Sequence, residues 1–321
     1  MSSTHHQRPT HNHYKNVPTY IQIETTIKCN ATCWFCPQHN SLRRPNYMEE
    51  KVWKKIIDES RGFGATYRPF ILNEPFADKR MPEIVRYIKQ DPTAKVEFNT
   101  NASMLTPKVT DQLLEIGVDI MRFSIDGLYR STFDESRGIS YDHVYQHVKY
   151  FLAANRAMGN KTNTEVRMIN LPDTEQEQIE FKDYWSQHQP GNIIFTNLYK
   201  YPWEGQTQSL PLPCLKIENE MHFYVDGKAT LCCWDTKGRQ IVGDVNTQSV
   251  LDIWNGTELA RCRTLLDHGQ RDQLDLCQRC DAYAHVDFSQ WQEQLPPAKS
   301  KTPLANPIDI PIKVEPSVAT N

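Results

Sequence analysis

The sequence predicts an α/β fold, an incomplete (β/α)6 TIM barrel left open on one side, followed by a small cysteine-rich domain. From Tyr20 onward, short apolar runs alternate with helical patterns at a spacing of about thirty residues, which is typical of a parallel sheet. The cysteines fall into an early and a late group, and a Pro-rich linker at 201–213 separates the two parts of the chain.

Six strands are expected from apolar, β-branched runs. They are Tyr20–Glu24, Phe70–Leu72, Val96–Asn99, Ile120–Ser124, Glu165–Met168 and Ile193–Phe195. Five helices are expected between and after them from apolar spacing. The first three are marked by Val52, Trp53, Ile56 and Ile57, by Ile84, Val85 and Ile88, and by Val109, Leu113 and Leu114 after Pro107. The fourth runs from Tyr141 to Met158 and stops at Gly159, and the fifth opens with a capping box from Thr174 to Glu177.

These patterns divide the chain into four parts. We expect a disordered tail over 1–16, the barrel over 17–203, the cysteine-rich domain over 204–290 and a second disordered tail over 291–321. The first tail holds His5, His6, His11 and His13, which could bind a metal, but nothing apolar nearby would order them.

Composition excludes several classes of function. A net charge of −3 and a pI near 6.4 provide no basic field for nucleic acid. No apolar run approaches the roughly 20 residues of a membrane span, and the N-terminal residues lack the apolar core of a signal peptide. Nine cysteines in an unexported chain favour metal ligands and free thiols over disulfides, so we expect a cytoplasmic protein.

Three cysteines follow the first expected strand directly, in the run Cys29-Asn-Ala-Thr-Cys33-Trp-Phe-Cys36. Thiolates are the usual ligands of iron–sulfur clusters, and a complete site takes four of them. Three thiolates therefore leave one iron without a protein ligand. A redox dithiol or half of a zinc site is the alternative for a CxxC, but Cys29 adds a third ligand and no fourth is close in sequence.

The late cysteines form a second pattern. Cys214 and Cys232 enclose a hairpin signal at Asp226-Gly227, whose strands are His222–Val225 and Ala229–Cys232. A helix from about Ser249 to Leu266 then returns the chain, so that the CxxC of Cys277 and Cys280 can close a four-thiolate site. A hairpin with a CxxC also builds zinc ribbons, so zinc is the alternative to an iron–sulfur cluster here.

The first cysteine pattern, with an aromatic before its last Cys, resembles the signature of the radical S-adenosylmethionine (SAM) superfamily. The resemblance implies a [4Fe-4S] cluster on Cys29, Cys33 and Cys36 whose open iron is chelated by SAM, and a 5′-deoxyadenosyl radical formed from SAM. It also implies SAM contacts at strand ends that resemble family motifs. These residues are Phe35, Asn73, Glu74, Asn101, Ser124 and Arg137. The chain departs from the family where Leu72 and Asn73 replace two glycines and where Ala102 replaces a third.

The second pattern resembles the SPASM/twitch extension of radical SAM enzymes, in its shorter form with one auxiliary [4Fe-4S] cluster on Cys214, Cys232, Cys277 and Cys280. The spacing looks like that of a twitch dehydrogenase. The resemblance implies oxidation of a small polar or carbohydrate-like molecule, with the auxiliary cluster as electron acceptor and a flavodoxin- or ferredoxin-type reductant.

Three other functions stay open. Epimerisation needs a hydrogen donor, for which the remaining thiols Cys233 and Cys262 are candidates, although both fit small buried residues. Peptide or protein modification is a second possibility, weakened by the lack of an N-terminal winged-helix domain. A zinc-stabilised or electron-transfer binding module is a non-enzyme alternative, but it leaves the polar strand ends without a purpose.

Overall fold

The computed structural model describes residues 14–40, 46–198 and 214–280, and in this part of the chain one nine-stranded sheet organises the fold. The sheet order is β6-β5-β4-β3-β2-β1-β7-β8-β9. Strands β1 to β6 are parallel neighbours in sequence order, as an open barrel requires, so the predicted α/β class is confirmed. They are β1 (Tyr20–Ile23), β2 (Thr66–Arg68), β3 (Lys95–Thr100), β4 (Ile120–Ser124), β5 (Asn163–Asn170) and β6 (Asn192–Asn197).

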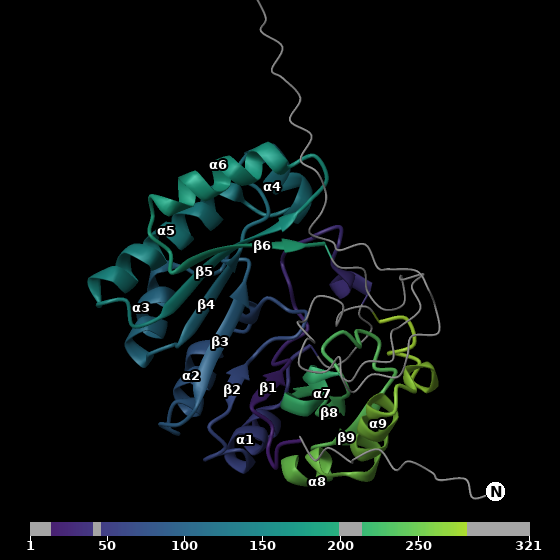
Figure 1. The fold of residues 1–321 in the computed structure, drawn as a ribbon. Coiled ribbons are helices and arrows are strands. Elements are labelled where there is room, and N and C mark those ends of the chain that lie inside the picture. The colour runs from purple at the N-terminus through teal and green to yellow at the C-terminus, as the bar shows by residue number, and fades with distance from the viewer. Residues whose placement is uncertain (1–13, 41–45, 199–213, 281–321) are drawn as a thin grey trace, which may run out of the picture.

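Helices cover the outer face of the curved sheet (Figure 1). They are α1 (Glu50–Glu59), α2 (Met81–Ile88), α3 (Pro107–Ile116), α4 (Arg130–Arg137), α5 (Tyr141–Ala157) and α6 (Glu175–Ser186), with short 3-10 turns η1 (Pro37–Asn40) and η2 (Pro75–Ala77). Helix α1 buries Val52, Trp53, Ile56 and Ile57, as its spacing predicts. Burial of each such side chain stabilises the fold by about 1.5–3 kcal/mol. Among the described helices, none has the length and apolar content of a membrane span.

The C-terminal part continues the same sheet. Strand β7 (Glu220–Phe223) pairs in parallel with β1, and β8 (Lys228–Thr230) and β9 (Ile241–Asp244) follow as antiparallel neighbours. The hairpin at Asp226-Gly227 is therefore confirmed. The helices of this part are α7 (Leu215–Asn219), α8 (Val250–Trp254), α9 (Thr257–Asp267) and the turn η3 (Arg271–Gln273). Because β7 pairs with β1, the C-terminal part, which carries the late cysteines, lies beside the strand that leads into Cys29.

The second strand differs from the prediction. It covers Thr66–Arg68 rather than Phe70–Leu72. Pro69 follows Arg68 and has no N–H to donate, so the strand ladder ends there. Phe70, Ile71 and Leu72 instead line a cavity at the carboxyl end of the sheet.

Two helix predictions are also wrong. The helix expected over Ser249–Leu266 is split into α8 and α9, because Gly256 adopts an extended conformation at the N-cap of α9. The expected capping box at Thr174 is absent from α6. The Glu177 carboxylate accepts hydrogen bonds from the backbone N–H groups of Leu128 and Tyr129 instead, at 2.6 and 2.8 Å.

Several features were not foreseen. Strand β9 and helices α4 and α7 are additional elements, and residues 14–15, assigned to a disordered tail, pack against the C-terminal part. The Tyr14 hydroxyl donates to Asp267 at 2.6 Å, and Trp254 Nε1 donates to the Lys15 carbonyl at 2.8 Å. The rest of that tail with its four histidines, the linker at 201–213 and the tail over 291–321 lie outside the described residues.

Candidate active site

The loop from Cys29 to Cys36 leaves the carboxyl end of β1, where parallel α/β barrels place their chemistry. Backbone bonds tie it to two distant segments. Thr32 N donates to the Arg137 carbonyl at 2.9 Å, and Glu74 N donates to the Lys28 carbonyl at 3.0 Å. Gly138 has a positive φ and packs so closely on Thr32 that a side chain at this position would collide with the loop. The loop is thus fixed by the ends of η2 and α4.

The three thiols of this loop face different surroundings. Cys33 is buried, whereas Cys29 and Cys36 are half-buried and open onto separate hollows. Burial raises the pKa of all three thiols, to about 11 for Cys29, and at Cys33 the guanidinium of Arg137 opposes the effect. Thiols of this kind stay protonated at neutral pH unless a metal binds them and takes the place of the proton.

Arg137 is a buried cation beside Cys33. It is 7% exposed, pairs with Asp126, and lies 3.8 Å from Cys33 Sγ through Nη1. Burial alone would lower the pKa of Arg137, but Asp126 and Cys33 more than offset it. Its Nε is buried and finds no hydrogen-bond acceptor among the described residues. That nitrogen is free to bind an acidic group of a ligand.

Asn73 and Glu74 follow β2, and their side chains differ in whether a polar atom lacks a hydrogen-bond partner. Both side-chain oxygens of Glu74 are in use, with Thr100 Oγ1 at 2.6 Å, Asn101 N at 2.8 Å and Phe76 N at 3.2 Å as donors. Burial raises the pKa of Glu74 to about 7, although these donors oppose the shift. Asn73 accepts from Ile71 N at 3.0 Å, while its Nδ2 is buried without a partner among the described residues.

The other predicted SAM contacts lie at the same edge of the sheet, but hydrogen bonds join only some of them. Asn101 donates to Asn30 in the cysteine loop at 3.2 Å, and its backbone binds Glu74. Phe35 lines a cavity beside Cys36. Ser124 ends β4 half-buried, and no hydrogen bond joins its side chain to the other candidates in the described part of the chain.

The late cysteines converge from three segments. Cys214 precedes α7, Cys232 follows β8, and Cys277 and Cys280 follow η3. Burial raises the pKa of Cys277, and the charges of Cys214 and Cys280 add to the rise. The pKa of Cys232 is raised by its hydrogen bond with Cys233, by burial and by Cys214. The charges of these thiols thus act on one another, although no three of the four sulfur atoms lie within 4.8 Å of one another. All nine cysteines of the chain are free thiols.

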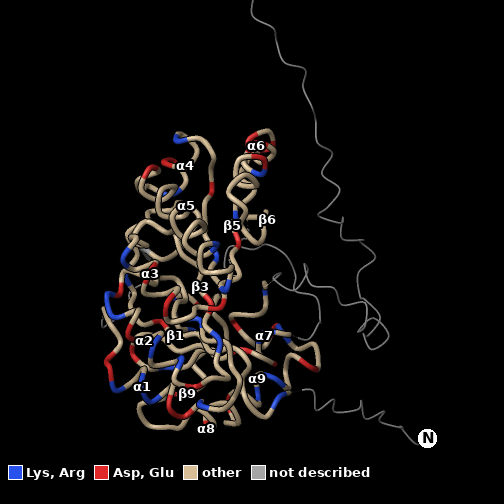
Figure 2. The backbone as a smooth tube through the Cα atoms, turned by 90° about the vertical axis from the view of Figure 1, so that its left-hand side faces the viewer, with Lys and Arg blue, Asp and Glu red and all other residues tan. Residues whose placement is uncertain are grey.

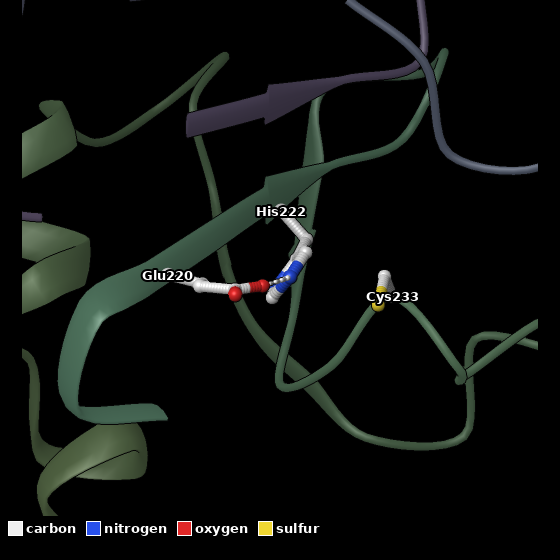
Figure 3. Close-up of side chains that lie close together, drawn as sticks. All are labelled: Glu220, His222 and Cys233. Atoms are coloured by element: carbon white, nitrogen blue, oxygen red, sulfur yellow. Dashed lines mark hydrogen bonds and ion pairs between the residues drawn. The ribbon is translucent and has the colours of Figure 1, made fainter. Parts of the chain in front are cut away.

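A polar cluster beside these cysteines was missed by the sequence analysis. Glu220, His222 and Cys233 lie with their ligand atoms within 4.8 Å of one another (Figure 3). His222 Nε2 is 3.2 Å from Glu220, and the imidazole is fully buried. The only signal for the cluster is the spacing of Glu220 and His222, two residues apart on one strand and hence on one face.

One cavity connects the two groups of cysteines. It has a volume of about 510 Å³, and its wall includes Phe35 and Cys36 from the first loop and Lys216, Cys233 and Trp234 from the C-terminal part. Of the two candidate hydrogen donors, Cys233 therefore reaches the cavity. Cys262 is fully buried on α9, with its sulfur 3.9 Å from Glu258, and lies outside the described cavity wall.

Comparison with known families identifies the fold and chemistry. The model of the radical SAM superfamily matches residues 23–183, which is half of the chain. The chain belongs to the radical SAM superfamily. A second model, the iron–sulfur cluster-binding domain SPASM, matches residues 214–281. The protein is thus a radical SAM enzyme with a SPASM domain, and its cofactors are SAM, a [4Fe-4S] cluster and auxiliary iron–sulfur chemistry.

Similar proteins include a SAM-dependent 2-deoxy-scyllo-inosamine dehydrogenase of Niallia circulans, 23% identical over 81% of this chain and 92% of that protein. A solved structure of BtrN with AdoMet and 2-DOIA superimposes with a TM-score of 0.58 at 18% identity, over 83% of this chain and 93% of the other. The structure of Streptococcus suis SuiB bound to precursor peptide SuiA superimposes with a TM-score of 0.65 at 14% identity, over 83% of this chain and 72% of the other. At these identities the structures establish the fold alone.

The residues present fit the cofactors that a radical SAM enzyme requires. Three free thiols within eight residues provide three iron ligands, which is one fewer than a closed cluster takes. Arg137 Nε and Asn73 Nδ2 are buried donors without partners in the described residues, beside this loop, and suit the carboxylate of an amino-acid ligand such as SAM. The donor set therefore agrees with the family assignment.

Proposed function

We propose that this radical SAM enzyme dehydrogenates a small polar molecule bound in the 510 Å³ cavity. Cys29, Cys33 and Cys36 would hold the cluster that binds SAM, and Cys214, Cys232, Cys277 and Cys280 would hold one auxiliary [4Fe-4S] cluster. When bound, SAM and its cluster supply a 5′-deoxyadenosyl radical, and the auxiliary cluster supplies an electron acceptor. Asn73 and Arg137 would orient SAM through their unpartnered donors.

The observation that carries the proposal is the shared wall of the cavity. Cys36 lines it from one side, while Lys216 and Cys233 line it from the other, next to the predicted ligands Cys214 and Cys232. A substrate in this space would lie between the source of the radical, which removes one hydrogen atom, and the acceptor of the second electron, while the accompanying proton passes to a base or to water. The likeness to a dehydrogenase of a cyclitol amine over most of the chain supports the same outcome. The cytoplasmic location and the flavodoxin- or ferredoxin-type donor stay predictions.

The first test measures SAM cleavage in the dithionite-reduced, reconstituted protein. Cys33→Ala should reduce 5′-deoxyadenosine formation to background, whereas Cys262→Ala, a buried thiol outside both predicted sites, should leave it intact. The assignment fails if the Cys33 variant cleaves SAM at the unmodified rate.

Epimerisation is the second candidate, and the position of Cys233 on the cavity wall favours it. There a thiol S–H would return a hydrogen atom to the substrate, and the resulting thiyl radical would need an electron from the external reductant and a proton. Turnover in deuterium oxide separates the two outcomes. Oxidation yields a product two hydrogens lighter, whereas a thiol donor places one deuterium on carbon at an unchanged oxidation state.

A peptide substrate is the third possibility, because a similar structure holds a precursor peptide. A cavity of about 510 Å³ lined by charged side chains favours a small molecule over an extended chain. Mass spectrometry of the product would distinguish them.

A further inference from the structure

The cavity that we assign to the substrate has a strongly basic wall. Arg68, Arg122, Arg167 and Lys216 line it, and Glu97 is the one acidic side chain among its described lining residues. The arginines come from β2, β4 and β5, so their positions are set by the sheet rather than by mobile loops. In Figure 2, blue and red segments meet beside the β3 label, in the middle of the fold.

The carboxylates of this region are already paired with basic side chains. Glu97 pairs with both Arg68 and Arg122, and Glu165 pairs with Arg122 at 2.8 Å and with Arg167 at 2.6 Å. Glu220 accepts from Arg68 at 3.3 Å and from Lys216 at 3.4 Å. Four cations therefore share three carboxylates. Among these side chains the cations outnumber the carboxylates by one.

Each guanidinium also has one terminal nitrogen that takes part in none of these ion pairs. Arg68 uses Nε and Nη1, Arg122 uses Nε and Nη1, and Arg167 uses Nε and Nη2 for these pairs. The remaining Nη atom of each arginine has no hydrogen bond to any described residue and is not buried away from solvent. Arg68 is further held in place by stacking on the Tyr20 ring, 4.1 Å from its centroid. Three arginines that line one cavity thus each have a donor without an acceptor among the described residues.

We propose that the substrate carries an anionic group, a phosphate or a carboxylate, which Arg68, Arg122 and Arg167 bind, with Lys216 as a further cation. The planar fork of arginine matches the oxygen pairs of both groups. An amine at this position would meet like charge in a low-dielectric space. The inference rests on the proposed function, because it takes the cavity as the substrate site.

The test measures binding to the reconstituted, SAM-loaded protein by anaerobic calorimetry. The probes share one carbon skeleton and differ in charge: glucose, glucose 6-phosphate, gluconate and glucosamine. Glucose 6-phosphate or gluconate should bind at least about 10-fold more tightly than glucose, and glucosamine should bind no better than glucose. The better of the two anions identifies the group as phosphate or carboxylate.

Arg167→Met is the matching variant, because Glu165 keeps Arg122 as its partner and the sheet stays neutralised. It should weaken binding of the preferred anion about 10- to 100-fold. Arg130→Met, at an exposed ion pair on α4, is the control and should leave binding unchanged. The inference is overturned if neither anion binds below about 10 mM, if glucose or glucosamine binds as well, or if both variants lose affinity equally. Formation of 5′-deoxyadenosine by the unmodified protein, measured in parallel without a probe, shows separately whether the SAM-cleaving part of the proposed function holds.

Discussion

Two buried glutamates, one in each half of the molecule, show opposite electrostatic behaviour. Burial raises the pKa of Glu74, beside the first cysteine loop, from 4.5 to about 7. Burial also acts on Glu220 in the C-terminal part, but there His222, Lys216 and Arg68 lower the pKa to about 2. Glu74 receives hydrogen bonds only from neutral donors, whereas Glu220 is surrounded by basic groups. At Glu74 the hydrogen-bond donors and the charge of Arg137 do not offset burial, whereas at Glu220 the three basic groups together outweigh it.

The same contrast applies to the thiols. In the first loop a single guanidinium, that of Arg137, opposes the effect of burial on Cys33. In the C-terminal part the hydrogen bond from Cys232, together with Lys216 and His222, lowers the pKa of Cys233 despite its burial. The first site is thus built on one buried ion pair and the second on a network. This difference makes distinct predictions for each half.

The largest effect is expected at the single ion pair. Arg137→Ala should lower the free energy of unfolding by about 3–5 kcal/mol, because it leaves the carboxyl group of Asp126, which is 1% exposed, without its ion-pair partner. The same substitution at Arg130, whose pair with Asp142 is exposed, should have no measurable effect. Urea unfolding of both variants checks this, and equal losses would contradict the account.

A smaller effect is expected in the network. Glu220→Gln should lower the free energy of unfolding by about 1.5–3 kcal/mol at pH 7.5, because three basic groups lose their shared anion. The pKa of Glu220 is lowered on folding, so its contribution is present above pH 4.5 and disappears as the pH falls towards 2. The difference in unfolding free energy between the variant and the unmodified protein should therefore become smaller below pH 4.5. Glu175→Gln, exposed on α6, is the control, and a gap that stays constant in acid would refute the prediction.

Glu74 should show the opposite pH dependence. Its pKa is raised on folding, so the folded state binds the proton more tightly and stability falls as the pH rises from 4.5 through 7. We expect a loss of about 2 kcal/mol from this residue between pH 5 and 8. Glu74→Gln should remove that part of the slope in urea titrations. An unchanged slope would show that Glu74 does not titrate in this range.

The sequence was sufficient where signals are local. The cysteine spacings, the Asp226-Gly227 hairpin and the apolar face of α1 each depend on residues close in the chain, and the structure or the family models bear them out. The second strand was misplaced because the apolar run Phe70–Leu72 outweighed the effect of Pro69. Those apolar residues serve the cavity rather than the sheet.

Contacts between distant segments could not be foreseen. The pairing of β7 with β1 joins residues about two hundred positions apart, and it brings Glu220 and Lys216 to Arg68. Nothing local in the sequence indicates that pairing, so the basic wall of the cavity was not predicted. Likewise, the Glu177 carboxylate accepts a hydrogen bond from the backbone N–H of Leu128 and does not form the expected capping box.

The central claim is a division of roles between two thiol sites, and metal analysis combined with EPR spectroscopy tests it most directly. The reconstituted, reduced protein should contain about eight irons per chain, and both Cys33→Ala and the double variant Cys277→Ala/Cys280→Ala should contain about four. SAM should alter the EPR signal of the double variant and leave that of the Cys33 variant unchanged. A signal in the Cys33 variant that responds to SAM, or zinc in place of iron at the C-terminal site, would contradict the account.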